Sequence, residues 1–110
     1  MAVHSVSALT QYIKSMFRAE GMLRNVSVEG ELSNYKMYAS GYCYFTLKDE
    51  AASLKGVMFK SRARLLCFQP ENGMKVVATG EVSVYERDGA YQLYVERLVP
   101  VGAGELSIAF

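Results

Sequence analysis

The amino-acid sequence predicts a mainly β domain, with five strands closed into a small barrel, a helix before the first strand and a short helix between the third and fourth. Three observations favour this fold. Polar and apolar residues alternate over five segments, as in strands that bury one face. Two other segments carry apolar residues at helical spacing. Gly30 and Gly80 lie inside strand-like segments, where a small barrel needs a bend.

The chain has 110 residues, enough for one domain with its own core but too few for two. Its formal net charge is +1, from 12 basic and 11 acidic residues, so any surface that binds a polyanion must be a local patch. No signal-peptide pattern or apolar run of membrane-spanning length is present, and we expect a cytoplasmic protein. Cys43 and Cys67 are expected as free thiols at core positions, with a disulfide between them as the alternative.

The first predicted element is a helix from Ser7 to Glu20, with Ser5 or Ser7 as its N-terminal cap. Its apolar positions recur every four residues: Leu9, Ile13 and Phe17. Gly21 is expected to end the helix, because glycine readily adopts the left-handed conformation that follows many helices. We expect this helix to pack across the barrel.

The stretch from Val26 to Asp49 is predicted to form two strands joined by a polar, aromatic-rich loop. The second strand runs from Tyr42 to Lys48, and Gly30 supplies a bend in the first. One face of the pair is apolar and is expected to be buried: Val26, Val28, Leu32, Cys43, Phe45 and Leu47. The other face carries tyrosines and lysines and is expected to be exposed to solvent.

The later elements follow the same two periodicities. A short turn leads into a third strand over 53–59, and a helix over 60–68 turns its basic residues toward solvent. The fourth strand, over 74–85, bends at Gly80. An Asp-Gly turn, which is typical of hairpins, joins it to a fifth strand over 91–101.

This order of elements is that of the five-stranded Greek-key barrel called the OB-fold. We therefore expect an OB-fold nucleic-acid-binding domain over residues 1–101. Residues 102–110 are expected to begin a linker or helix that leads to a catalytic domain outside this sequence.

Aromatic rings interleaved with cations indicate that the exposed face of the first hairpin binds an unpaired nucleic-acid strand, since every base offers a ring face for stacking. The candidate stacking residues are Tyr35, Tyr38, Tyr42 and Tyr44, with Val57 or Phe59 on the third strand. The candidate phosphate contacts are Lys36, Lys48, Lys55, Lys60, Arg62 and Arg87. A single tyrosine is also typical of an ordinary half-buried strand, and we assign Arg64 to a solvated helix face. It is the clustering of the tyrosines that favours a binding role.

Several segments together resemble a known family: SVSALTQYIK, NVSVEGELSN, SGYCYFTLKDE, VMFKSRARLLCFQPENGMKV and GEVSVYERDGAYQLYVERLVPVGAGELSIAF. They cover nearly all of residues 5–110 and are similar to the N-terminal domain of the large subunit of bacterial exodeoxyribonuclease VII. The resemblance implies an OB-fold that grips single-stranded DNA for a separate nuclease domain, which hydrolyses the strand from both ends to oligonucleotides. It also implies a small partner subunit, bound through the absent part of the chain. The family usually has a histidine where this chain has Tyr42, so a role of that histidine does not transfer.

No catalytic residue, metal ligand set or cofactor motif is predicted within these 110 residues, and His4 lies in a frayed N-terminal lead-in. Glu29 and Glu31 share a strand face, which leaves open a compact metal nuclease that binds magnesium there. The competing interpretation is a solvated strand face that pairs with lysine across the sheet. A further alternative is a protein-interaction module whose tyrosine face receives a partner or another domain of its own chain.

Overall fold

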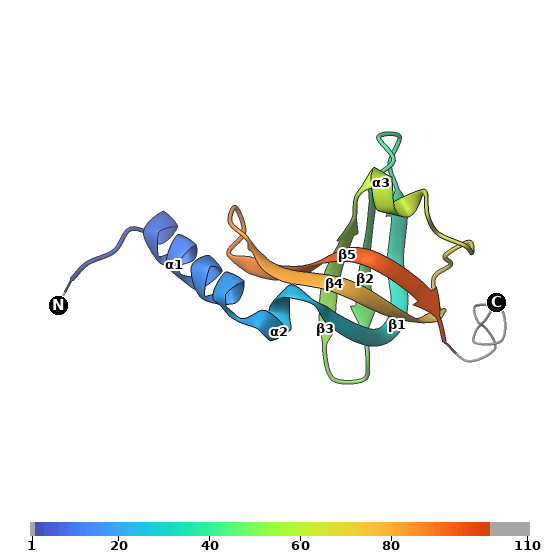
Figure 1. Ribbon diagram of the computed structural model, residues 1–110, viewed down its shortest axis with the longest axis horizontal. Coiled ribbons are helices and arrows are strands. Elements are labelled where there is room, and N and C mark those ends of the chain that lie inside the picture. The colour runs from blue at the N-terminus through green and yellow to red at the C-terminus, as the bar shows by residue number, and fades with distance from the viewer. Residues whose placement is uncertain (1, 102–110) are drawn as a thin grey trace.

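Five strands close into a barrel in the order β1-β2-β3-β5-β4 in the computed structural model, which describes residues 2–101 (Figure 1). The strands are β1 (Val26–Met37), β2 (Cys43–Lys48), β3 (Ser53–Met58), β4 (Lys75–Tyr85) and β5 (Ala90–Pro100). The helices are α1 (Val6–Ala19), α2 (Gly21–Arg24) and α3 (Lys60–Ala63). Neighbouring strands are antiparallel except β3 and β5, which are parallel. The predicted barrel and its order of elements are confirmed, whereas the predicted linker at 102–110 lies outside the described residues.

Glycines allow the two sharp changes of strand direction that close the barrel. Gly30 lies where β1 passes from β4 to β2, and a Cβ there would lie 3.3 Å from the Leu47 Cβ atom and from the Lys48 backbone. In β4 the pairing with β5 shifts at Gly80, where a Cβ would overlap the backbone carbonyl of Tyr94. A Cβ at Gly80 is therefore excluded by the neighbouring backbone, whereas one at Gly30 would be in tight contact with it.

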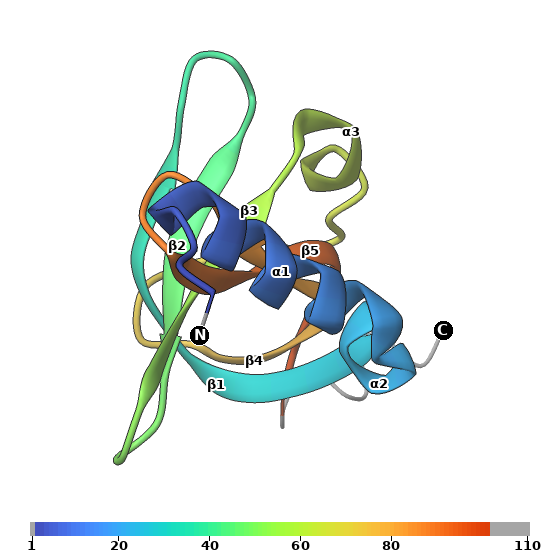
Figure 2. The same ribbon diagram turned by 90° about the vertical axis from the view of Figure 1, so that its left-hand side faces the viewer.

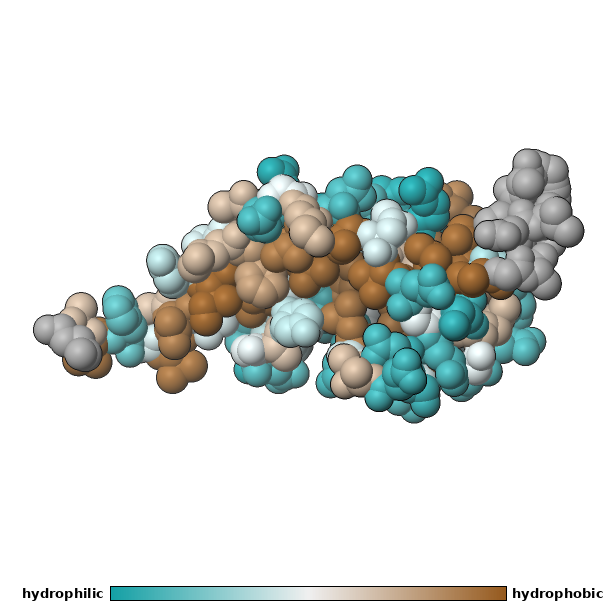
Figure 3. Space-filling view, turned by 90° about the horizontal axis from the view of Figure 1, so that it is seen from below, coloured by the Kyte–Doolittle hydropathy of each residue, from teal (hydrophilic) through white to brown (hydrophobic). Residues whose placement is uncertain are grey.

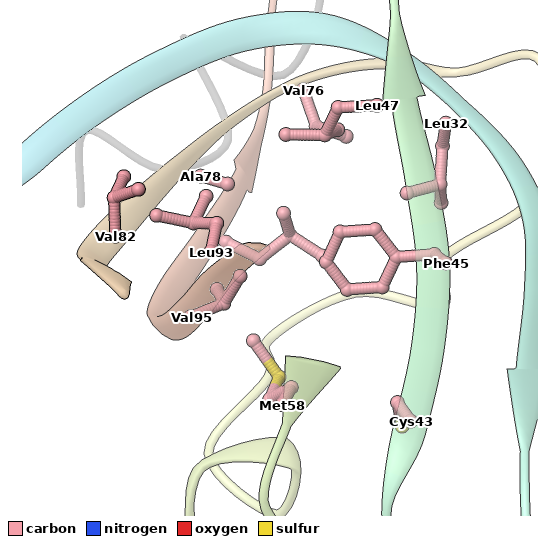
Figure 4. Close-up of a cluster of buried hydrophobic side chains, with 11 residues drawn as sticks. Leu32, Cys43, Phe45, Leu47, Met58, Val76, Ala78, Val82, Leu93 and Val95 are labelled. Carbon is pink, nitrogen blue, oxygen red and sulfur yellow. The ribbon is translucent and has the colours of Figure 1, made fainter. Parts of the chain in front are cut away.

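The core fills the barrel interior with side chains that alternate along the strands, so that about every second residue points inward (Figure 4). Its buried members are Leu32, Cys43, Phe45, Leu47, Met58, Val76, Ala78, Val82, Leu93, Val95 and Leu98. The predicted burial of Leu32 and of the inward side chains of β2 is thus confirmed. Alternation places the intervening side chains on the outer surface of the barrel.

The predicted helix over 60–68 is too long, since α3 ends at Ala63. Only its first turn is helical, and the chain then continues toward β4 without regular structure. Because the helix ends before Cys67, this residue is exposed, and the prediction that it lies in the core is wrong. Both cysteines are free, and Cys43 is buried as expected.

The first helix begins one residue earlier than predicted and ends one residue earlier. Ser5 is the cap, and its hydroxyl oxygen accepts a hydrogen bond of 3.1 Å from the Ala8 backbone N–H. Gly21 does not end the helix in a left-handed conformation; it begins α2, and the positive-φ glycines within residues 2–101 are Gly41, Gly73 and Gly89. The chain bends instead at Glu20, which has an extended backbone.

The expectation that α1 packs across the barrel is also wrong. The helix projects from one end of the barrel (Figures 1 and 2) and, of its side chains, Phe17 packs against the core cluster. The Lys14 Nζ atom lies 2.6 Å from a carboxylate oxygen of Glu86, in the β4–β5 turn, and this ion pair holds the helix on its polar side. A stripe of large apolar side chains therefore remains exposed: Val6, Leu9, Tyr12, Ile13 and Met16. Figure 3 shows brown apolar surface at this end of the molecule.

Within residues 2–101, no helix has the length and apolar character needed to cross a membrane. The longest, α1, has 14 residues and carries charged side chains on its polar side, including Lys14 and Arg18. At 1.5 Å per residue such a helix extends for about 21 Å, well short of the roughly 30 Å hydrocarbon core of a bilayer.

Candidate nucleic-acid interface

Strand register assembles one row of outward side chains that crosses all five strands. Each member is the pairing partner of the next, on β1, β2, β3, β5 and β4 in turn: Lys36, Tyr44, Val57, Tyr94 and Glu81. Their neighbours along each strand, including Phe45, Met58 and Leu93, point into the core. The row therefore lies on the outer surface of the barrel.

Five aromatic residues line this outer surface and form what we call the aromatic strip: Tyr38, Tyr42, Tyr44, Phe59 and Tyr94. The ring centroids of Tyr38 and Tyr44 are 5.2 Å apart, and those of Tyr42 and Phe59 are 5.3 Å apart. Phe59 in turn lies 6.2 Å from Tyr94. These rings meet at angles between 37° and 80°, so no pair of them is stacked face to face. Faces of the exposed rings remain accessible to a flat ligand.

A groove of about 430 Å³ lies beside the strip across β1, β2 and β3, and we call it the aromatic groove. It is lined by Asn34, Tyr35, Lys36, Tyr38, Tyr44, Phe45, Thr46, Lys55, Gly56, Val57 and Gln92. None of these lining residues carries a carboxylate. Lys36 and Lys55 are its cations, and the Lys36 Nζ atom lies 6.0 Å from the centre of the Tyr38 ring. The groove thus combines ring faces with positive charge.

Tyr35 and Lys36 belong to β1 and not to the predicted loop, because β1 continues to Met37. Two residues lie between Ser33 and Lys36, whereas one residue lies between their partners on β2, and Asn34 has a φ of 53°. This extra residue turns Lys36 outward beside Tyr44. Tyr35 is half-buried instead, with its ring stacked 6.3 Å from that of Phe45.

The Tyr35 hydroxyl lies 3.3 Å from the Cys43 Sγ atom. The pKa of Tyr35 is raised, mainly by burial of the hydroxyl and to a smaller extent by this hydrogen bond. The ring therefore lines the aromatic groove while it packs against the core. Tyr42, predicted as the first residue of the second strand, precedes β2 and lies beside Phe59.

A second hollow of about 550 Å³ lies between α1, α3 and the β4–β5 pair, and we call it the helix groove. Its lining is Lys14, Arg18, Val57, Phe59, Ser61, Arg62, Glu81, Ser83, Tyr94, Val95 and Glu96. Val57 lines both grooves but is only 6% exposed, so it forms a floor between them and offers no stacking surface. Phe59 is 47% exposed, and it is the residue of the predicted pair that presents a ring.

The remaining predicted cations lie apart from these grooves. Lys60 packs along the β1–β2 loop, where a Cβ on Gly41 would lie 2.7 Å from its Cγ atom, and it lines neither groove. Arg87 is exposed in the β4–β5 turn, beside the ion pair of Glu86 with Lys14, and also lines neither. Lys48 lies at the other end of β2.

Sequence reasoning did not identify Tyr94, Lys14 or Arg18 as site residues. The alternation of β5, in which Leu93 and Val95 are buried, was a signal that Tyr94 points outward. Lys14 and Arg18 carried no such signal, because their place in the helix groove depends on how α1 sits against the barrel.

The predicted pair Glu29 and Glu31 lies in a third hollow of about 700 Å³, which we call the acidic groove. Its lining is Glu29, Gly30, Glu31, Lys48, Asp49, Glu50 and Lys75. The Lys75 Nζ atom is 3.8 Å from a Glu29 oxygen, which agrees with the interpretation of a lysine-paired strand face. Among residues 2–101, no group of three or more histidine, cysteine, aspartate or glutamate side chains is placed to hold a metal ion.

Comparison with known proteins agrees with the fold. The family described as an OB-fold nucleic acid binding domain matches residues 4–99. Two solved structures share the fold at low identity. A Replication Protein A heterotrimer bound to ssDNA has a TM-score of 0.58 at 12% identity, covering 73% of this chain and 59% of that one. Asparaginyl-tRNA synthetase from Pyrococcus horikoshii has a TM-score of 0.56 at 18% identity, covering 74% of this chain and 21% of that one.

Much more similar sequences carry the name exodeoxyribonuclease 7 large subunit. The relative from Ruminiclostridium cellulolyticum is 51% identical over 108 residues, which are 98% of this chain and 27% of the relative. The relative from Bacillus subtilis is 50% identical over 106 residues, which are 96% of this chain and 24% of the relative. The chain thus spans about a quarter of the length of these curated relatives.

Proposed function

Since the chain belongs to the family of OB-fold nucleic acid binding domains, we propose that it binds single-stranded DNA as the DNA-gripping domain of an exodeoxyribonuclease VII large subunit. The observation that carries the proposal is the aromatic groove. Exposed rings of Tyr38 and Tyr44 lie there beside Lys36 and Lys55, with no carboxylate in the lining. OB-folds receive oligonucleotides on this face of β2 and β3 and on the loop between β1 and β2.

In this proposal, bases stack on the aromatic strip and the two lysines contact phosphates. Stacking contributes roughly 1–3 kcal/mol per base and tolerates any sequence, because all bases have a ring face. A protein that neutralises about three to five phosphates of a single strand has a log-log salt slope of about −2 to −3.5. The net charge of +1 leads us to expect weak binding by the isolated domain, and weaker binding as salt is added.

The proposed role in the longer protein follows from the relatives' name. Residues 1–101 would hold the strand, while a separate domain outside this sequence hydrolyses phosphodiester bonds to release oligonucleotides. The small subunit would bind that absent part of the chain, and the complex would act in DNA catabolism in the cytoplasm. The family description favours this role over that of a protein-interaction module.

The test is fluorescence anisotropy with a labelled oligothymidine of about 12 nucleotides at low salt. Tyr44→Ala should weaken binding about tenfold, the loss of one stacked base. Tyr85→Ala is the matched control, because Tyr85 is 40% exposed, close to the 42% of Tyr44, yet lines none of the three grooves. The absence of any binding by the folded wild-type domain would refute the proposal. An equal loss from both substitutions would refute the assigned site.

A further inference from the structure

We propose that the helix groove is a second nucleotide subsite, in which Arg18 and Arg62 hold a phosphate while Phe59 and Tyr94 offer ring surface to the adjoining base. The inference rests on the proposed function of the aromatic groove and extends the path of the bound strand. It gives α1, which lies outside the barrel, a direct part in binding.

The two grooves adjoin on the outer surface, where they share one lining residue. Val57 lines both, and Tyr94 follows it in the row that strand register builds. The Phe59 ring lies 5.3 Å from Tyr42 and 6.2 Å from Tyr94, so these three rings form one run, of which Phe59 and Tyr94 line the helix groove. A strand stacked over Tyr44 can therefore reach Tyr94 by crossing Val57, the register partner of both tyrosines.

Charge in the helix groove points to the two arginines. Lys14 is occupied, since Glu86 contacts its Nζ atom at 2.6 Å. Among the described residues, no carboxylate oxygen lies within 4 Å of the guanidinium of Arg18 or of Arg62. Arg18 comes from α1 and Arg62 from α3, on different walls of the groove. A planar guanidinium suits a phosphate because it can donate two parallel hydrogen bonds.

The helix groove also contains two carboxylates, those of Glu81 and Glu96, whereas the aromatic groove contains none. These carboxylates offset much of the arginine charge, so the groove is a poor site for a bare polyanion. A nucleotide adds a base that gains stacking energy on Tyr94 or Phe59. The helix groove should therefore distinguish a DNA strand from a polyphosphate of equal charge.

The test compares oligothymidines of about 4 and about 12 nucleotides by anisotropy, because one subsite holds the short strand and both hold the long one. Arg18→Ala combined with Arg62→Ala should weaken binding of the long strand about tenfold and flatten its salt slope by about 0.7, the value for one phosphate. Binding of the short strand, held by the aromatic groove, should change less than about twofold. Inorganic polyphosphate should displace the long strand poorly at equal phosphate concentration.

Matched controls are Arg64→Ala, next to the C-terminal end of α3, and Arg97→Ala, on β5, since both arginines are exposed and line neither groove. Thermal melts establish that every variant is folded. A long strand that binds wild type and the double variant equally overturns this inference and leaves the proposed function standing. Equal losses for both strand lengths, or efficient displacement by polyphosphate, also overturn it. A wild-type domain that binds neither strand overturns both proposals.

Discussion

The aromatic groove and the acidic groove lie at opposite ends of one β1–β2 ladder, yet their chemistry is opposite. At one end Lys36 pairs with Tyr44, and at the other Glu31 pairs with Lys48. The aromatic groove has ring faces, two lysines and no carboxylate, whereas the acidic groove has four carboxylates, two lysines and no ring. The acidic groove is the larger of the two, at about 700 Å³ against 430 Å³.

Under the proposed function, neither the size of a hollow nor the net charge locates the binding site in this domain. The net charge of +1 conceals two oppositely charged grooves: the aromatic groove would attract a phosphate backbone, and the acidic groove would repel it. Screening limits surface charges to a range of about 10 Å at ordinary salt, so each groove acts according to its own side chains. The predictions that follow either remove this difference between the two grooves or measure it.

The largest effect is expected from making the aromatic groove resemble the acidic one. Lys36→Glu combined with Lys55→Glu removes two phosphate contacts and adds repulsion, so affinity for oligothymidine should fall about 100-fold. Anisotropy titrations at low salt measure the change. Lys48→Glu combined with Lys75→Glu is the matched control in the acidic groove, and it should leave affinity within about threefold. Equal losses would show that only overall charge matters.

Two glycine substitutions test how closely the atoms pack beneath the aromatic groove and beside the acidic groove. A Cβ on Gly56, under the aromatic groove, would lie 2.5 Å from a ring carbon of Phe45, a core residue that is 3% exposed. Gly56→Ala should lower the free energy of unfolding by about 2 kcal/mol. Gly30→Ala, beside the acidic groove, meets its nearest atoms at 3.3 Å and should cost about 1 kcal/mol. Urea denaturation measures both, and the reverse order would contradict this account of the packing.

The smallest effect concerns the acidic groove alone. Asp49 accepts hydrogen bonds of 2.9 and 2.8 Å from the backbone N–H groups of Ala51 and Ala52, and these bonds lower its pKa. A carboxyl whose pKa is lowered by folding stabilises the fold above its unfolded pKa of about 4, and loses that contribution as pH falls through the folded value. Asp49→Ala should therefore slightly lower the melting temperature at neutral pH but not in acid. DNA affinity at neutral pH should not change, and a loss would give the acidic groove a part in binding.

The barrel could be predicted from the sequence because its signals are local. Alternation identified the inward side chains of β2, and Gly30 and Gly80 marked the places where strands bend. The sequence predicted that either Ser5 or Ser7 caps the first helix, and the cap is Ser5. Each of these features depends on a few neighbouring residues.

The site could be predicted only in part, because its details depend on tertiary structure. The extra residue between Ser33 and Lys36 turns Tyr35 toward Phe45, and Asn34, whose residue type tolerates its positive φ, does not by itself specify a bulge. The early end of α3 exposes Cys67 although apolar spacing continues past it. The position of α1, which brings Arg18 to the helix groove, is set by Phe17 and by the ion pair of Lys14 with a turn far along the chain.

The most direct test of the central claim is a two-dimensional NMR titration of the isotope-labelled domain with oligothymidine. The account predicts that resonances of Lys36, Tyr44 and Lys55 shift progressively, while those of Glu29, Glu31 and Asp49 at the other end of the same ladder stay in place. Shifts confined to the acidic groove or to the exposed stripe of α1, with the aromatic groove unmoved, would contradict it.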